Sequence, residues 1–254
     1  MNDREFQKAY EDELTPSWGT WATVGWTFLI ALVAIGIQVL AGSAAVIGTM
    51  RGDPGITVTE IEQVVTDNGL LLSLATLLEM PFVLGLAWYF ASLVPGTTPK
   101  EYLALKMPGW KETLIWSAIF LVYLALSDGI RLLQGEPLIP EYMERVYHTA
   151  GWLPLLWLTL MVAAPLIEES IFRGFLFKGL LKSPLKAPGT MVFTALSWSV
   201  LHLQYEHLTD MLILFFGGVL LGLARLRSHS LILCVYIHFL WNLVATLEMV
   251  FFLK

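Results

Sequence analysis

Two adjacent carboxylates and an arginine interrupt a long apolar stretch of the chain, within Pro165-Leu-Ile-Glu-Glu-Ser-Ile-Phe-Arg-Gly174. The sixteen residues from Trp152 to Ile167 contain no ionisable side chain. A charge near the centre of a bilayer costs at least about 2.5–3.5 kcal/mol, so charged residues there need partners. Glu169 and Arg173 are four residues apart, on one face of a helix, where they can pair. Glu168 lies about 100° round the helix and has no such partner, so it is predicted to be free for chemistry.

Two histidines in other apolar segments are candidates to face Glu168. His202 ends the sequence Trp198-Ser-Val-Leu-His202, and His238 begins His238-Phe-Leu-Trp-Asn242, where His238 and Asn242 share a helical face. Counted from the inner ends of their segments at ~1.5 Å per residue, Glu168, His202 and His238 lie roughly 20, 18 and 12 Å deep. We expect the three to meet near the middle of the membrane, because each would be costly against lipid.

Such a cluster can support two kinds of chemistry. A carboxylate and an imidazole around one water can remove its proton, which is general-base catalysis of hydrolysis. A second imidazole and an amide NH₂ can then donate hydrogen bonds to an oxyanion. Alternatively, two histidines and one carboxylate can ligate zinc and leave a position open for water. Both arrangements are compatible with hydrolysis of a peptide bond inside a membrane.

The composition indicates the setting of these residues. The chain has 254 residues, of which 56% are hydrophobic and 14% are charged, and its mean hydropathy is +0.67. These values predict an all-α, polytopic membrane protein. The net charge of −6 offers no basic surface, which excludes nucleic acid as a partner. A single cysteine, Cys234, excludes a disulfide framework.

Apolar segments predict about seven transmembrane helices, and a missed re-entrant segment would make eight. We expect a cytoplasmic N-terminal segment at 1–20 and a single membrane domain at 21–254. Ile56 to Val65 is predicted to form a short interfacial helix. The predicted spans are Trp21–Ile47, Leu70–Val94, Thr113–Leu133, Trp152–Leu180, Thr190–Leu203, Leu212–Leu226 and Leu231–Phe252.

Lysine and arginine are distributed unequally between the two ends of these spans. If the N-terminus is inside, ten of these residues lie on the inner side and four on the outer side, which predicts a cytoplasmic N-terminus and an external C-terminus. The inner residues are Arg4, Lys8, Lys100, Lys106, Lys111, Lys178, Lys182, Lys186, Arg225 and Arg227, and the outer ones are Arg51, Arg131, Arg145 and Lys254.

Three motifs together resemble a known family. Glu168-Glu169-x-x-x-Arg173, an aromatic residue four before a histidine at Trp198 to His202, and His238-x-x-x-Asn242 are similar, in order and placement, to the CAAX protease and bacteriocin-processing (CPBP, or ABI) family. That family includes the type II CAAX prenyl endopeptidases, the Ras-converting enzymes. The resemblance covers about residues 152–247. The departure is Trp198, because phenylalanine is usual there.

The resemblance implies a CAAX-protease-like helical bundle and an intramembrane endopeptidase in the plasma membrane of a prokaryote. Glu168 and His202 would activate water, His238 and Asn242 would support the oxyanion, and Glu169 and Arg173 would hold the site. Family members have been described both as metalloproteases and as metal-free glutamate proteases. If zinc is used, Glu168, His202 and His238 would be its ligands. Asn242 is a poor zinc ligand and a good donor, which favours the metal-free form. The expected partners are the bilayer and a membrane-embedded or lipidated peptide or protein substrate.

Other interpretations remain open at this point. The buried charges could form a structural ion network, and the histidines could join helices by hydrogen bonds. A catalytically silent scaffold or chaperone on the same fold is the main alternative, and a proton-coupled transporter is another. The sequence shows no internal repeat, which counts against transport. For Glu79 there are two interpretations: it bonds backbone groups freed by Pro81, which we favour, or it lines a substrate path. We further expect Asp128 to pair with Arg131, and the glycines at 218 and 222 to serve close helix packing.

Overall fold

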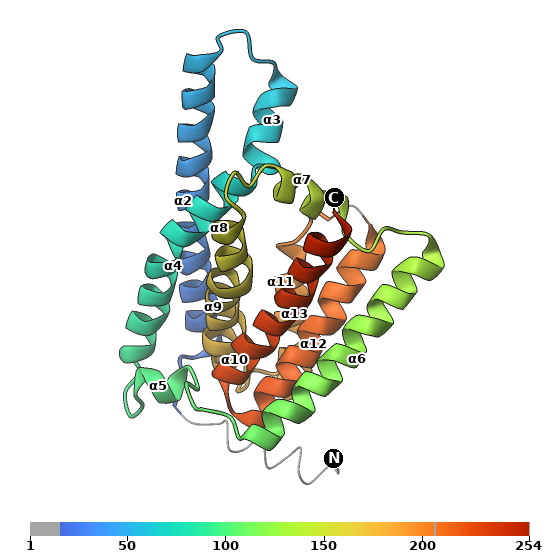
Figure 1. Cartoon of the computed structure of the whole chain (residues 1–254). Helices are drawn as coiled ribbons and strands as arrows, with labels where there is room; N and C mark the ends of the chain where they lie inside the picture. Colours follow the sequence, from blue (N-terminus) through green and yellow to red (C-terminus); the bar gives the residue numbers. More distant parts are fainter. Residues whose placement is uncertain (1–15, 206, 254) are drawn as a thin grey trace.

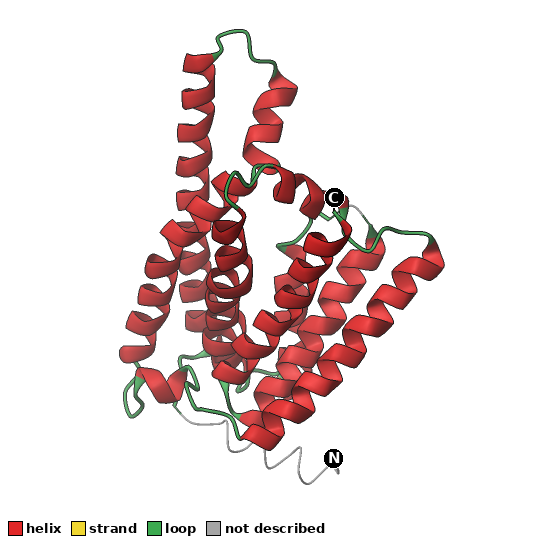
Figure 2. Cartoon of the chain, in the orientation of Figure 1, coloured by secondary structure: helices red, strands yellow, loops and turns green. Residues whose placement is uncertain are grey.

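The computed structural model describes residues 16–205 and 207–253, and Figure 2 shows that the regular elements in this part of the chain are all helical. The all-α prediction is therefore confirmed. The N-terminal segment predicted at 1–20 lies mostly outside the described residues. In chain order the helices are α2 (Thr20–Gly52), α3 (Val58–Thr66), α4 (Gly69–Ser92), α5 (Pro99–Tyr102), α6 (Trp110–Gln134), α7 (Glu141–His148), α8 (Leu153–Leu158), η1 (Thr159–Ala163), α9 (Ala164–Glu169), η2 (Ser170–Leu176), α10 (Phe177–Leu180), α11 (Lys186–Val200), α12 (Leu208–Ser228) and α13 (Leu231–Phe252).

Six helices of the described chain are long and apolar enough to cross a membrane. They are α2, α4, α6, the continuous run from α8 to α10, α12 and α13. The helix at the fifth predicted span, α11, is not among them, since it has only 15 residues. Beyond Val200 the backbone tightens, and the amides of Leu201 and His202 bond carbonyls three residues back. α11 packs along α12, and α2 begins at the end of the bundle opposite to that where α13 ends (Figure 1).

The helix that carries the two glutamates is not a uniform α-helix. Two π-helical turns, η1 and η2, lie directly before and after α9. Pro165 has no N–H to donate to the carbonyl of Met161, and its ring crowds that turn, which accounts for a wider turn at η1. π turns of this kind are frequent at functional sites. Glu168 and Glu169 are therefore presented between two irregular turns.

Aromatic packing and one close backbone approach fix this helix against the N-terminal helices. Trp26 of α2 stacks on Phe90 of α4 with ring centroids 4.3 Å apart, and Phe90 contacts Phe175 of η2. A Cβ atom at Gly179 of α10 would lie 1.9 Å from Oγ1 of Thr23. Only glycine allows α10 to approach α2 this closely, so Gly179 fixes the C-terminal end of the site helix against α2.

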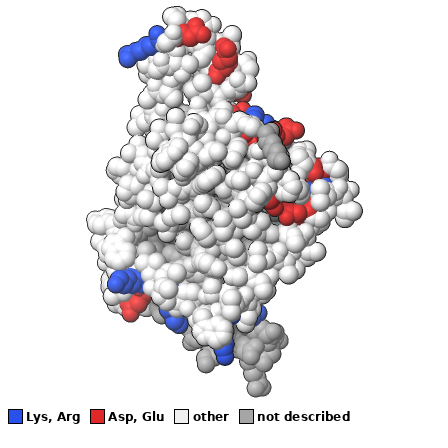
Figure 3. Space-filling model, viewed as in Figure 1, with Lys and Arg blue, Asp and Glu red and all other residues white. Residues whose placement is uncertain are grey.

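Charged side chains gather at the two ends of the molecule and leave a broad uncharged band between them (Figure 3). The structure corrects part of the charge count, because Lys178 and Arg225 are buried, and buried Arg131 forms an ion pair with Asp210. Without these three, eight basic residues on the predicted inner side still face three on the outer side. Asp128 lies beside Glu248 and near Arg131, so the expected local pair of Asp128 and Arg131 is replaced by a larger network.

The topology can be tested with single cysteines at opposite ends of the molecule. We expect Lys182→Cys to react with a membrane-impermeant maleimide only after cells are permeabilised, because the inner side carries more positive charge. Glu62→Cys on α3 should react in intact cells and serves as the matched control. Cys234 is fully buried and gives no background. The reverse labelling pattern would overturn the orientation.

Candidate functional site

Glu168 lies at the centre of a small polar group contributed by three segments of the chain. Its Oε2 accepts a hydrogen bond from Nε1 of Trp198 in α11. The same oxygen lies 3.9 Å from Nε2 of His202 and 4.0 Å from Nε2 of His238. These separations are too long for direct hydrogen bonds, but one water can bridge groups at such distances. The Glu168 side chain is 22% exposed, so water can reach it.

His202 is held in one orientation by its own turn. The structure places it just after the end of α11 and not inside the helix as the sequence predicted. Its Nδ1 lies 3.0 Å from the carbonyl oxygen of Trp198. A carbonyl only accepts, so Nδ1 carries the proton and Nε2 presents a lone pair toward Glu168. Two acceptors thus face each other, an arrangement suited to the two O–H groups of a water.

The ring of Tyr205 packs against the ring of His202. The two rings are stacked, with centroids 6.2 Å apart and an interplanar angle of 14°. Burial raises the pKa of the Tyr205 phenol well above its usual range, and the charges of Asp210 and Glu168 add to the rise. The phenol therefore stays neutral beside the site.

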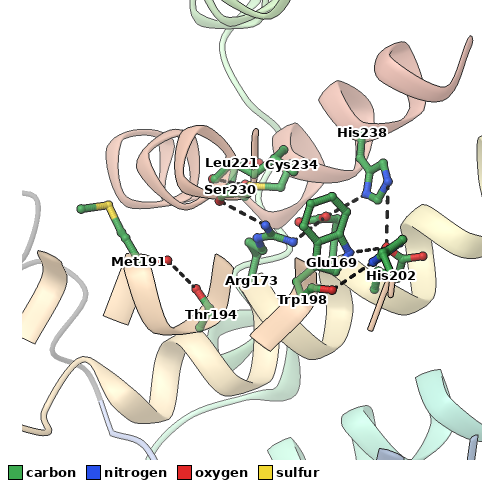
Figure 4. Close-up of polar contacts among 12 residues, drawn as sticks. Glu169, Arg173, Met191, Thr194, Trp198, His202, Leu221, Ser230, Cys234 and His238 are labelled. Carbon is green, nitrogen blue, oxygen red and sulfur yellow. Dashed lines mark hydrogen bonds and ion pairs between the residues drawn. The ribbon is translucent and has the colours of Figure 1, made fainter. Parts of the chain in front are cut away.

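His238 is joined to Glu169, the second glutamate of the pair (Figure 4). Its Nδ1 lies 2.8 Å from Oε1 of Glu169, and both side chains are almost completely buried. This bond keeps a proton on Nδ1 and aims Nε2 at Glu168. With Nδ1 protonated, Nε2 can donate a hydrogen bond only when it carries a proton as well.

Arg173 completes the buried chain of charges. Its guanidinium lies 3.0 Å from Oε1 of Glu169, donates to the carbonyl of Gly218 at 3.1 Å and sits 5.0 Å from the ring centre of Trp198. A Cβ atom at Gly218 would come within 3.1 Å of this guanidinium. Gly218 makes room for Arg173 and also packs closely on Ala195, and Gly222 packs closely on Met191, so both glycines serve the close helix packing that the sequence predicted.

Asn242 follows His238 by one helical turn and lines the same cavity. Its Nδ2 donates to the carbonyl oxygen of Leu160 in η1 at 2.7 Å. An amide NH₂ has two N–H groups, so one remains for another acceptor. The π turn η1 thus supplies the carbonyl that orients Asn242.

A cavity of about 690 Å³ opens next to these residues. It is lined mainly by apolar side chains, and Glu168, His202, His238 and Asn242 all reach its wall. A volume of this size is in the range of sites that bury most of a small ligand or a short peptide segment. The polar group therefore faces a space that a substrate could enter.

The side chains proposed as zinc ligands fit a zinc ion poorly. Two ligands that are each about 2.1 Å from a tetrahedral zinc lie roughly 3.4 Å apart. Oε2 of Glu168 lies 3.9 and 4.0 Å from the two Nε2 atoms, and the Trp198 N–H already occupies it. Within the described ranges, no group of three His, Cys, Asp or Glu side chains is arranged to hold a metal ion.

The structure brings all six site residues predicted from the sequence into one cluster, either on the cavity wall or directly behind it. Sequence reasoning missed three contacts: the Trp198 N–H to Glu168, the bond between Glu169 and His238, and the ring of Tyr205 on His202. Only the first contact could have been suspected from the sequence, because Trp198 stands where the family usually has phenylalanine.

Comparison with known proteins points to the same part of the chain. Residues 150–244 match a family described as type II CAAX prenyl endopeptidase Rce1-like. An uncharacterized 24.3 kDa protein of Escherichia coli is 38% identical over 85 residues, which are 32% of this chain and 38% of that relative. The similarity to this relative thus spans well under half of either protein. No solved structure gives a significant match.

Proposed function

We propose, on the premise that residues 150–244 belong to the CAAX protease (CPBP) family, that this membrane protein is an intramembrane endopeptidase. Its substrate would be a membrane-embedded or lipidated peptide or protein. The observation that carries the proposal is the geometry around Glu168. A carboxylate oxygen and the lone pair of an imidazole face each other at 3.9 Å on the wall of a cavity.

In the proposed reaction, a water is held between Oε2 of Glu168 and Nε2 of His202. Glu168 takes a proton as the water oxygen bonds to the scissile carbonyl carbon, which is general-base catalysis. The proton then passes to the nitrogen of the leaving group as the C–N bond breaks. The products are a new carboxyl group and a free amine. No step requires a metal ion.

His238 and Asn242 would stabilise the oxyanion that forms on the carbonyl oxygen. Asn242 has an N–H group beyond the one that bonds Leu160, and it lies on the cavity wall. His238 would act with its ring doubly protonated, because only this form has a proton on Nε2. Glu169 would hold the ring in position through Nδ1, at 2.8 Å. Donors placed in advance in this way are worth roughly 10²–10³-fold in rate each.

Mass spectrometry of a peptide library tests the proposal directly. The full chain, purified and reconstituted in nanodiscs, is expected to cut membrane-inserting or lipidated peptides at one defined bond. One product should carry a new carboxyl terminus and the other a new amino terminus. Intact peptides after long incubation, in the presence of measurable peptide binding, would favour the silent scaffold instead.

Treatment with a chelator in the same experiment tests whether cleavage requires a metal ion. We expect cleavage to persist after exhaustive chelation, with far less than one zinc per chain, because Glu168 cannot serve as both a ligand and a free base. Stoichiometric zinc, with activity lost on chelation and recovered on adding zinc, would assign Glu168, His202 and His238 as ligands. The base would then have to be sought elsewhere, beginning with Glu169.

A further inference from the structure

Another glutamate, Glu79, is buried and lines the same cavity. It lies near the middle of α4, is 8% exposed and falls outside the residues that match the family. Glu79 and Glu168 both line the cavity, and α4 packs against α9 (Figure 1). A buried carboxylate within a membrane-spanning helix is costly and marks a functional position by default.

The contacts of Glu79 do not give it a purely structural role. Its Oε2 accepts a hydrogen bond from Nε2 of Gln38 in α2 at 2.9 Å. No backbone group freed by Pro81 bonds it among the described residues, so the expected proline-kink role is not observed. Within that part of the chain, Oε1 accepts no hydrogen bond at all. Gln38 thus holds the carboxylate in place and leaves one oxygen for something that enters the cavity.

The charges around the cavity indicate what that partner would be. Five carboxylates lie on its described wall, those of Glu79, Asp128, Glu168, Asp210 and Glu248. Arg131 is the single lysine or arginine among the described lining residues, and it pairs with Asp210. Carboxylates that share a poorly solvated space repel each other, and a cation between them removes that repulsion. The cavity is therefore suited to a positive group and unsuited to a free carboxylate.

We propose that Glu79 is a specificity-determining residue that binds a lysine or arginine side chain of the substrate peptide, close to the scissile bond. This inference rests on the proposed endopeptidase function and adds the substrate's charge to it. A cation on Oε1 of Glu79 would hold the peptide in the cavity that Glu168 also lines. A charge-assisted bond of this kind also fixes the register of the peptide.

The test compares three apolar, fluorescently labelled leucine–alanine peptides that differ only in one central residue, which is lysine, norleucine or glutamate. The full chain in nanodiscs should bind the lysine peptide at least about tenfold more tightly than the norleucine peptide, a difference of about 1.4 kcal/mol. Glu79→Gln should abolish that preference. The same change at exposed Glu62 is the matched control and should preserve it. Hydrolysis is measured on the same samples.

The possible outcomes distinguish failure of the Glu79 proposal from failure of the endopeptidase proposal. A lysine preference that Glu79→Gln removes, without hydrolysis, supports the role of Glu79 and counts against the endopeptidase. Hydrolysis with equal affinity for all three peptides overturns the role of Glu79 and leaves the endopeptidase standing. Equal affinities, or none, without hydrolysis contradict both. The comparison of the three peptides on the wild-type protein tests the inference by itself. The inference can therefore still be overturned if the Glu79→Gln protein does not fold.

Discussion

Replacement of Glu168 by glutamine is expected to lower the rate of peptide cleavage by roughly 10²–10⁴-fold, because the general base is lost. The folded structure should be preserved. Glutamine has the same shape, and its carbonyl oxygen can still accept the N–H of Trp198. The Glu168 side chain is 22% exposed and has no buried cation as a partner, so its charge contributes little to stability.

The measurement needs initial rates on one cleaved peptide together with thermal unfolding of the same preparation. Glu62→Gln makes the identical chemical change on the exposed face of α3 and should leave both quantities unchanged. Wild-type turnover by Glu168→Gln would remove Glu168 as the base and with it the proposed mechanism.

The parts of the site that the sequence could predict depend on local spacing and on the membrane. Glu169 and Arg173 are four residues apart and form the expected pair. Glu168, His202 and His238 meet because a bilayer penalises each of them elsewhere. Most of the spans were predictable for the same reason, since hydropathy reports directly on the surrounding solvent.

The parts that the sequence could not predict depend on tertiary contacts. The bond between Glu169 and His238 joins residues 69 positions apart, and no periodic pattern specifies it. The tight turn after Val200 places His202 beyond the end of α11 and beside Glu168, and hydropathy does not register such a turn. Glu79 was assigned to a local kink because Pro81 is close in the sequence, whereas its hydrogen-bond partner, Gln38, is on another helix.

Replacement of Glu169 by alanine is expected to destabilise the protein by about 3–5 kcal/mol, in contrast to Glu168→Gln. Glu169 and Arg173 are fully buried, and removal of the carboxylate leaves the Arg173 charge without its counter-ion. For a chain of this length, the midpoint of thermal unfolding in detergent should fall by on the order of 10 °C. Activity should also fall, because His238 loses the partner at Nδ1 that orients its ring.

A double variant separates the charge effect from the loss of volume. Glu169→Ala combined with Arg173→Met removes both charges, so its unfolding midpoint should lie above that of Glu169→Ala alone. Its catalytic activity should nevertheless remain low, because His238 still lacks its partner. If Glu169→Ala unfolds at the wild-type temperature, the buried pair does not stabilise the fold. If the double variant is less stable than the single one, Arg173 stabilises the protein through Gly218 and Trp198 more than through Glu169.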